Sequence, residues 1–174
     1  MTAASASSVS LTEGRVKDAP VIQNLAQLYT HDFSEFWAGT SRGDLNLEGK
    51  FDPYPLDEYW TRPNWSAWLI WQGAALAGFA LINDQSHSGI PTGRNVGEFF
   101  ILRKYRGQGA GRIAARALFS RYPGQWEVAI ARKNVAAHKF WRSIIDGTAQ
   151  ASAREELDLR NDRWNGPVLR FEWR

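Results

Sequence analysis

The chain of 174 residues is organised around RGQGAGR, the heptapeptide at residues 106–112. The apolar segment Phe99–Leu102 precedes it, and a segment with helical periodicity follows it. Three glycines within five residues let the backbone approach a ligand closely, because no Cβ atom is in the way. A helix that begins there directs its unpaired N–H groups and the positive end of its dipole into the loop. The stretch therefore predicts a strand–loop–helix unit suited to binding a pyrophosphate.

Two better-known phosphate-binding loops do not fit this stretch. The dinucleotide-binding fingerprint G-x-G-x-x-G would need a third glycine where Arg112 stands. The P-loop pattern G-x-x-x-x-G-K-[ST] does not occur in the chain. What remains is the pattern R-x-x-G-x-G, formed by Arg106, Gly109 and Gly111. Taken alone, the hexapeptide also fits an ordinary glycine-rich turn between a strand and a helix.

A second motif begins some 22 residues after the glycine loop. Asn134, Ala137 and Phe140 fit the pattern N-x-x-A-x-x-F-[YW], which ends here in Trp141 and directly follows the apolar run 126–131. Asn134 is a good N-cap for the helix predicted after it. In order, separation and context the two motifs resemble those of the GNAT acetyltransferase superfamily, within it a branch of predicted acetyltransferases whose substrate is not implied. The resemblance is close over residues 95–146 and looser elsewhere.

The resemblance implies an α/β (α+β) fold, in which helices flank a mixed central sheet of six to seven strands that splays apart between strands four and five. Periodicity supports most of the expected order β-α-α-β-β-β-α-β-α-β-β in one domain over residues 1–174. We expect helices after Asp18, near 34–39, after the glycine loop and after Asn134. The strands are expected at 8–15, 65–71, 75–82, 96–102, 126–131, 149–158 and 167–173. Residues 31–62 are ambiguous, and residues 1–7 are expected to form a flexible tail.

Periodicity also predicts which face of the helix after the glycine loop is buried. Five apolar residues recur at helical spacing, while the arginines of this segment fall on the other side. We therefore expect one stripe to pack on the sheet, formed by Ala110, Ile113, Ala114, Ala117 and Leu118.

Composition and net charge limit the classes of protein to which the chain can belong. A chain of this length with 44% hydrophobic residues is expected to form one globular domain. It has no cysteine, which excludes disulfides and a cysteine acyl-enzyme, and its three scattered histidines predict no metal site. No apolar run reaches the ~18 residues that cross a bilayer, and the N-terminus lacks signal-peptide features. With a mild net charge of +3, we expect a cytoplasmic protein that binds neither membrane nor nucleic acid.

For the GNAT superfamily the resemblance implies that acetyl-coenzyme A (acetyl-CoA) binds between strands four and five. Its pantetheine arm would pair with the fourth strand through main-chain hydrogen bonds, as an added strand does. An amide N–H there would also stabilise the oxyanion that develops on the thioester carbonyl. The cofactor-binding residues carried over are Phe100, Ile101, Leu102, Arg106, Gly107, Gln108, Gly109, Ala110, Gly111, Arg112, Asn134 and Trp141.

Glu98 is the expected catalytic base. An amine acceptor with a pKa of about 10.4 is protonated at neutral pH and must lose a proton before it attacks. Side-chain alternation puts Glu98, Phe100 and Leu102 on one face of the fourth strand, and a carboxylate there can take the proton directly or through water. A structural carboxylate paired with an arginine is the alternative interpretation of Glu98. Glu127, on the fifth strand, is the second candidate base.

Trp141 departs from the family pattern. Many members have a tyrosine here that protonates the leaving thiolate, whereas an indole N–H is no practical proton donor. The general acid therefore stays unassigned, with water or one of Tyr29, Tyr54 and Tyr59 as candidates.

The expected function is direct transfer of the acetyl group from acetyl-CoA to an amine in a ternary complex. The acceptor would be a small-molecule amine or a peptide amine, and a homodimer is a family-level expectation. Trp37, Tyr59 and Trp60 fall where relatives form the acceptor wall. The alternative is a non-catalytic module that binds or senses coenzyme A. This alternative stays open because Trp141 stands where many family members have the tyrosine that protonates the thiolate.

Overall fold

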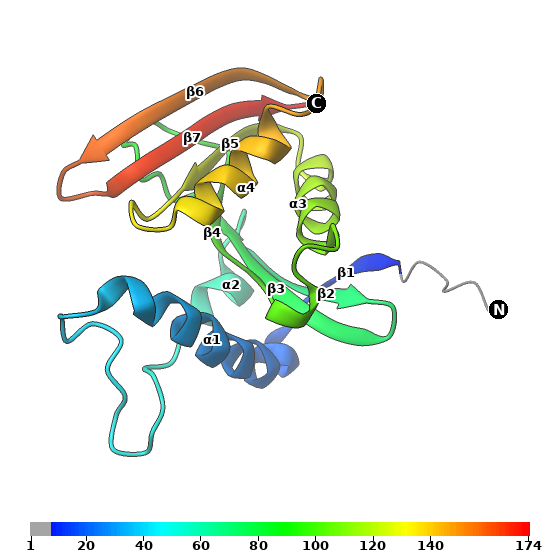
Figure 1. Ribbon diagram of the computed structural model, residues 1–174. Coiled ribbons are helices and arrows are strands. Elements are labelled where there is room, and N and C mark those ends of the chain that lie inside the picture. Colours follow the sequence, from blue (N-terminus) through cyan, green and yellow to red (C-terminus); the bar gives the residue numbers. More distant parts are fainter. Residues whose placement is uncertain (1–7) are drawn as a thin grey trace.

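A computed structural model describes residues 8–174, so the tail expected at residues 1–7 lies outside the described part. A seven-stranded sheet in the order β1-β2-β3-β4-β5-β7-β6 forms its centre (Figure 1). The strands are β1 (Val9–Glu13), β2 (Ser66–Gln72), β3 (Ala75–Asn83), β4 (Arg94–Ile101), β5 (Gly124–Ala129), β6 (Ala151–Arg160) and β7 (Asn165–Trp173). The α-helices are α1 (Ala19–Ser34), α2 (Asp57–Thr61), α3 (Ala110–Arg121) and α4 (Val135–Ile145). This order confirms the expected succession of elements, but the second α-helix is not where it was expected. Near 34–39 the chain forms only a short 3-10 helix, Glu35–Trp37, and α2 lies in the segment that the sequence left ambiguous.

The sheet opens between β4 and β5, which are its parallel neighbours. The two strands pair only where Arg94 meets Trp126 and Asn95 meets Glu127. Beyond Asn95 they diverge, and residues 96–101 of β4 pair with β3 alone. The expected splay between the fourth and fifth strands is therefore confirmed. It leaves one backbone edge of β4 unpaired in the middle of the sheet.

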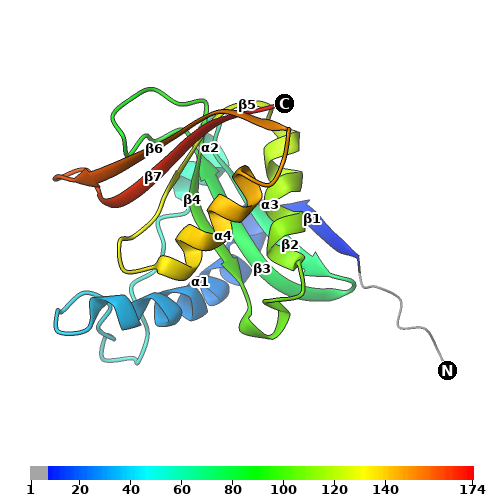
Figure 2. The same ribbon diagram turned by 45° about the horizontal axis from the view of Figure 1, so that its top comes forward.

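Hydrophobic clusters lie on both faces of the sheet, with α3 and α4 on one face and α1 on the other (Figures 1 and 2). The cluster under α3 is built around Phe119, which is fully buried. The ring centroid of Phe119 lies 4.8 Å from that of Trp126 and 5.0 Å from that of Trp173. The cluster under α1 is formed by residues of α1, β2, β3 and β4, among them Ile22, Leu25, Leu69, Phe79 and Phe100.

The prediction for the buried face of α3 is partly wrong. Ala110, Ala114 and Leu118 are buried as expected, but Ile113 is 51% exposed and Ala117 is exposed too. Ala115 and Phe119 take their places. The helix is rich in alanine, so periodicity alone discriminates weakly between its faces. The large aromatic ring of Phe119 enters the cluster instead and thereby sets the rotation of the helix.

Smaller differences concern the ends of elements. Asp18 stands at the N-cap position of α1, but its carboxylate accepts the N–H of Arg15 at 2.9 Å and makes no capping bond to the helix. β4 ends at Ile101, so Leu102 lies outside the strand in which it was expected. Among residues 8–174 there is no helix with the length and apolar character to cross a membrane.

We expect Phe119→Ala to lower the free energy of unfolding by about 3–5 kcal/mol, because removing a fully buried ring leaves a cavity between tryptophans. Ile113→Ala on the same helix is the matched control, and its effect should stay within about 0.5 kcal/mol. Urea unfolding followed by tryptophan fluorescence measures both values. Equal losses from the two variants would contradict the observed rotation of α3.

Candidate active site

Two cavities adjoin at the unpaired edge of β4. The larger has a volume of about 570 Å³ and lies between β4, the glycine loop, α1 and α4. The smaller has a volume of about 210 Å³ and extends from β4 toward the end of β5. The two share five lining residues, which are Tyr29, Phe33, Phe99, Asn134 and Ala137. A ligand in one cavity can therefore meet a ligand in the other.

The glycine loop forms one end of the larger cavity. Gly109 is the N-cap of α3 and has a φ of 86°, a left-handed conformation that glycine adopts without strain. At Gly111 a Cβ atom would lie 3.1 Å from the ring of Phe140, so a side chain there would press α3 away from α4. The first N–H groups of α3 have no acceptor within the helix. This end of the cavity therefore suits an anionic group.

Arginines surround the same end of the cavity. Arg106 donates from Nε to the carbonyl oxygen of Ile101 at 2.7 Å, and its guanidinium pairs with Asp32 of α1. Arg103 pairs with Asp32 as well, with its Nη2 2.8 Å from Oδ1. Burial raises the pKa of Asp32, but hydrogen bonds from the two guanidinium groups outweigh it and hold this pKa below its usual value. Asp32 thus ties α1 to the loop.

Most residues expected to bind the cofactor line the larger cavity. Those brought together are Phe100, Ile101, Arg106, Gly107, Gly109, Gly111, Arg112 and Asn134. Asn134 is also the N-cap of α4, since its Oδ1 accepts the N–H of Ala137 at 3.0 Å.

Four of the expected cofactor-binding residues do not line this cavity. The backbone of Leu102 is already engaged, because its N–H donates to Ala77 and its carbonyl accepts from Tyr105, both at 2.8 Å. Gln108 donates its side-chain amide to the carbonyl of Lys104 at 2.9 Å. Ala110 is buried in the core, and Trp141 is buried too but borders the smaller cavity.

Glu98 lies in the smaller cavity beside two tyrosines. Burial raises the pKa of its carboxyl to about 7, although hydrogen bonds from Tyr29 and Tyr54 lower it, as does the charge of Arg42. Phe100 belongs to the cluster under α1, and Tyr29 and Tyr54 pack against the same cluster, so side-chain alternation predicted the face of β4 correctly. Among residues 8–174 no arginine forms a direct ion pair with Glu98. A carboxyl with this pKa can both accept and release a proton near neutral pH.

The three tyrosines considered as proton donors differ in position. Tyr29 lines both cavities, and Tyr54 lines the smaller one, whereas Tyr59 lines neither. Burial raises the pKa of both Tyr29 and Tyr54 well above the usual value, and that of Tyr59 to about 12. All three hydroxyls are therefore protonated at neutral pH. Those of Tyr29 and Tyr54 donate to Glu98, whereas that of Tyr59 accepts from the side-chain amide of Asn83 at 3.0 Å.

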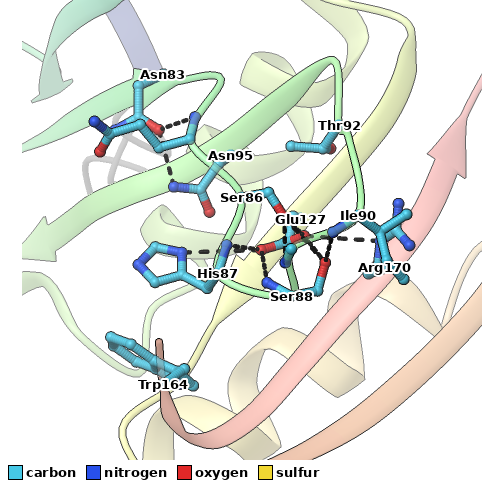
Figure 3. Close-up of polar contacts among 12 residues, drawn as sticks. Asn83, Ser86, His87, Ser88, Ile90, Thr92, Asn95, Glu127, Trp164 and Arg170 are labelled. Atoms are coloured by element: carbon cyan, nitrogen blue, oxygen red, sulfur yellow. Dashed lines mark hydrogen bonds and ion pairs between the residues drawn. The ribbon is translucent and has the colours of Figure 1, made fainter. Parts of the chain in front are cut away.

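Glu127, the second candidate base, anchors a loop instead (Figure 3). Its side chain is fully buried. Its Oε1 accepts the backbone N–H groups of His87 at 2.5 Å and Ser88 at 3.1 Å. Its Oε2 accepts the hydroxyls of Ser86 at 3.0 Å and Ser88 at 2.7 Å, and Nε of Arg170 lies 3.7 Å away. The carboxylate lines neither cavity and is engaged on both oxygens, which favours a structural role.

The anchored loop brings His87 to the smaller cavity. Its ring meets that of Trp164 edge-on, with centroids 4.6 Å apart (Figure 3). Burial lowers the pKa of His87 more than the charge of Glu127 raises it, so the imidazole is neutral at pH 7. Of the aromatic residues expected at the acceptor wall, Trp37 lines this cavity, whereas Tyr59 and Trp60 do not. Arg42, His87 and Trp164 belong to no motif, and no pattern in the sequence predicts their place here.

We expect Glu127→Gln to lower the free energy of unfolding by about 1–3 kcal/mol, because the amide replaces one oxygen of a carboxyl group that accepts four hydrogen bonds. Glu155→Gln is the matched control, since Glu155 faces the same Arg170 at 3.9 Å but is 52% exposed. Its loss should be below about 1 kcal/mol. Hydrogen exchange should also quicken at the amides of His87 and Ser88 in the first variant alone. Equal behaviour of the two would contradict the anchoring role.

Solved structures share this fold. An acetyltransferase of the GNAT family from Staphylococcus aureus Mu50 has a TM-score of 0.62 and 11% identity, with 96% of this chain and 100% of that chain covered. An acetyltransferase from Thermus thermophilus has a TM-score of 0.60 and 15% identity, with 94% of each chain covered. A Bacillus anthracis Ames protein in complex with acetyl coenzyme A has a TM-score of 0.54 and 14% identity, with 96% of this chain and 97% of that chain covered.

At these identities the likeness concerns the fold alone. No curated protein matches the chain in sequence. The model of the acetyltransferase (GNAT) family, however, matches residues 22–144, which is most of the chain. Together with the splayed sheet and the glycine loop, this match shows that the chain belongs to the GNAT acetyltransferase family.

Proposed function

We propose that this protein is an N-acetyltransferase that transfers the acetyl group of acetyl-CoA directly to an amine. The observation that carries the proposal is the meeting of the two cavities. One has a loop suited to phosphates, and the other holds a carboxyl whose pKa is about 7. Membership of the GNAT family supports the same conclusion.

The larger cavity has the features that acetyl-CoA requires. The unpaired edge of β4 at Phe99–Ile101 offers main-chain groups to the amides of a pantetheine arm. The N–H groups at the start of α3 suit a diphosphate, and Arg106 and Arg112 add positive charge. Arg112 is held toward α4 by Ser143, whose carbonyl accepts from it at 3.0 Å. When bound, acetyl-CoA would supply the acetyl group as an activated thioester.

In this proposal Glu98 receives the proton of the acceptor amine. Transfer from an ammonium of pKa about 10.4 to a carboxyl of pKa 4.5 costs about 8 kcal/mol, and transfer to one of pKa about 7 costs about 5 kcal/mol. Burial of Glu98 thus removes roughly 3 kcal/mol from this step. Hydrogen bonds from Tyr29 and Tyr54 orient the carboxylate.

In this arrangement, none of the described side chains is a dedicated general acid for the leaving thiolate of coenzyme A. Trp141 packs against Phe99, with ring centroids 5.1 Å apart, and its indole N–H does not ionise in water. Tyr29 is the one candidate tyrosine that lines both cavities, but its single hydroxyl proton is already donated to Glu98. A thiol with a pKa of about 8.5 leaves readily as a thiolate, and water can protonate it afterwards.

Calorimetry with acetyl-CoA and thiol release with a panel of amines test the proposal together. We expect saturable binding of acetyl-CoA and amine-dependent release of thiol. Gly109→Val should weaken the binding, because a β-branched residue is strained at a φ of 86°. Absence of binding heat would overturn the proposal. Binding without thiol release from any amine would favour the alternative, a module that senses coenzyme A.

We expect Glu98→Gln to lower kcat by roughly 10²- to 10⁴-fold, because the amide cannot accept the proton. The affinity for acetyl-CoA should stay unchanged, since Glu98 does not line the larger cavity. In the unmodified enzyme kcat/KM should rise with pH through about 7, because the carboxyl is protonated and inactive below that value. An unchanged kcat and pH profile in the variant would contradict the role of Glu98.

Tyr54→Phe tests the cause of this pKa. The hydroxyl of Tyr54 stabilises the ionised carboxylate, so its removal should raise the pKa of Glu98 and shift the acidic limb of the kcat/KM profile to higher pH. Tyr59→Phe is the matched control, because Tyr59 does not donate to Glu98 and lines neither cavity. The limb should stay in place in that variant. A shift of the same size in both would show that another group controls the limb.

A further inference from the structure

Arg42 stands at the wall of the smaller cavity and is held there by packing. It lies in the long loop between α1 and α2 (Figure 1), and its guanidinium carbon is 4.5 Å from the ring centroid of Trp37. The backbone of Gly43 approaches the same ring so closely that a Cβ atom there would lie 2.5 Å from it. Trp37 in turn packs against Phe33, with centroids 5.8 Å apart. Aromatic packing therefore positions this guanidinium.

Among residues 8–174, no carboxylate forms an ion pair with Arg42. The arginines at the larger cavity differ from Arg42 in this respect, because Arg103 and Arg106 both form ion pairs with Asp32. Arg42 lines the smaller cavity and not the larger one, so its charge is directed at the acceptor side. It acts on Glu98 through space and lowers the pKa of that carboxyl. The guanidinium of Arg42, which has no ion-pair partner among the described residues, can therefore pair with an anionic ligand.

The other titratable residues that line the smaller cavity further restrict the class of ligand that it can bind. Glu98 is the one acid among the described lining residues, and His87 is neutral. A second ammonium group on the acceptor would find no second carboxylate and would be repelled by Arg42. The volume of about 210 Å³ is below the roughly 300–1,000 Å³ of sites for drug-sized ligands. The acceptor must therefore be compact and carry no more than one cation.

We propose that the acceptor is a compact amino carboxylate, with its amine directed to Glu98 and its carboxylate paired with Arg42. A planar guanidinium matches a carboxylate through two parallel hydrogen bonds, which orients the ligand as well as binding it. The rings of Trp37 and Trp164 supply the apolar walls between the two ends. This inference rests on the proposed transfer function and names the class of its acceptor.

Matched pairs of acceptors test it with thiol release as the readout. Each pair consists of an α-, β- or γ-amino acid and the amine that remains when its carboxylate is removed. The carboxylated member of at least one pair should have a kcat/KM about 10- to 100-fold higher, as expected for a hydrogen-bonded charge pair. Arg42→Met should abolish that difference mainly through KM. Because Arg42 also lowers the pKa of Glu98, its removal should shift the acidic limb to higher pH for both members of a pair, so the readout is the ratio of their kcat/KM values at a pH above that limb.

Arg62→Met is the matched control, because Arg62 stacks on Trp65 at 4.6 Å in the same way but lines neither cavity. Its kinetics should equal those of the unmodified protein. Equal rates within every pair, or an equal loss on both members in Arg42→Met, would overturn the inference and leave the transferase function standing. Failure of every amine to release thiol would overturn the function and the inference with it.

Discussion

The divergence of β4 from β5 after two residue pairs is the constraint on which the site depends. A continuous sheet would satisfy the backbone of β4 on both sides, whereas here residues 96–101 pair with β3 alone. Unpaired backbone groups inside a protein need another partner, so this edge is suited to a ligand that pairs as a strand does. The glycine loop, α1 and α4 enclose that edge and give the larger cavity its anion-binding end and its apolar wall.

Charge is divided between the two cavities in a way that suits transfer between an anionic donor and an amine. Arg103, Arg106 and Arg112 lie at the larger cavity, and Asp32 binds two of them to α1. At the smaller cavity burial raises the pKa of Glu98 to about 7. The other glutamate is used differently, because Glu127 engages both its oxygens with a loop that carries His87 to the cavity wall. Two glutamates on neighbouring strands thus have separate roles, which their surroundings determine.

Trp141 shows how a substitution changes the chemistry that is left to the other residues. Its ring belongs to the aromatic packing with Phe99 and Phe140, and this packing holds α4 against β4. A tyrosine at this position would offer a hydroxyl, whereas the indole offers only a weak N–H donor. In the proposed mechanism the acceptor side therefore depends on Glu98 and its two tyrosines, and protonation of the leaving thiolate depends on solvent.

Local pattern was enough to predict the two strand-to-helix units, with the glycine loop before α3 and Asn134 at the cap of α4, and to place Glu98 and Phe100 on the same face of β4. These features depend on neighbours in the chain, through backbone conformation and side-chain alternation. The rotation of α3 could not be predicted, because an alanine-rich helix has no dominant face until Phe119 meets its aromatic partners. Folding also had to bring Asp32 to Arg106, Glu127 to the loop at 86–88, and Arg42 and Trp164 to one cavity wall. Such contacts join segments that lie tens of residues apart in the sequence. Hydrophobic periodicity reports only local structure, so it does not predict which loops come into contact.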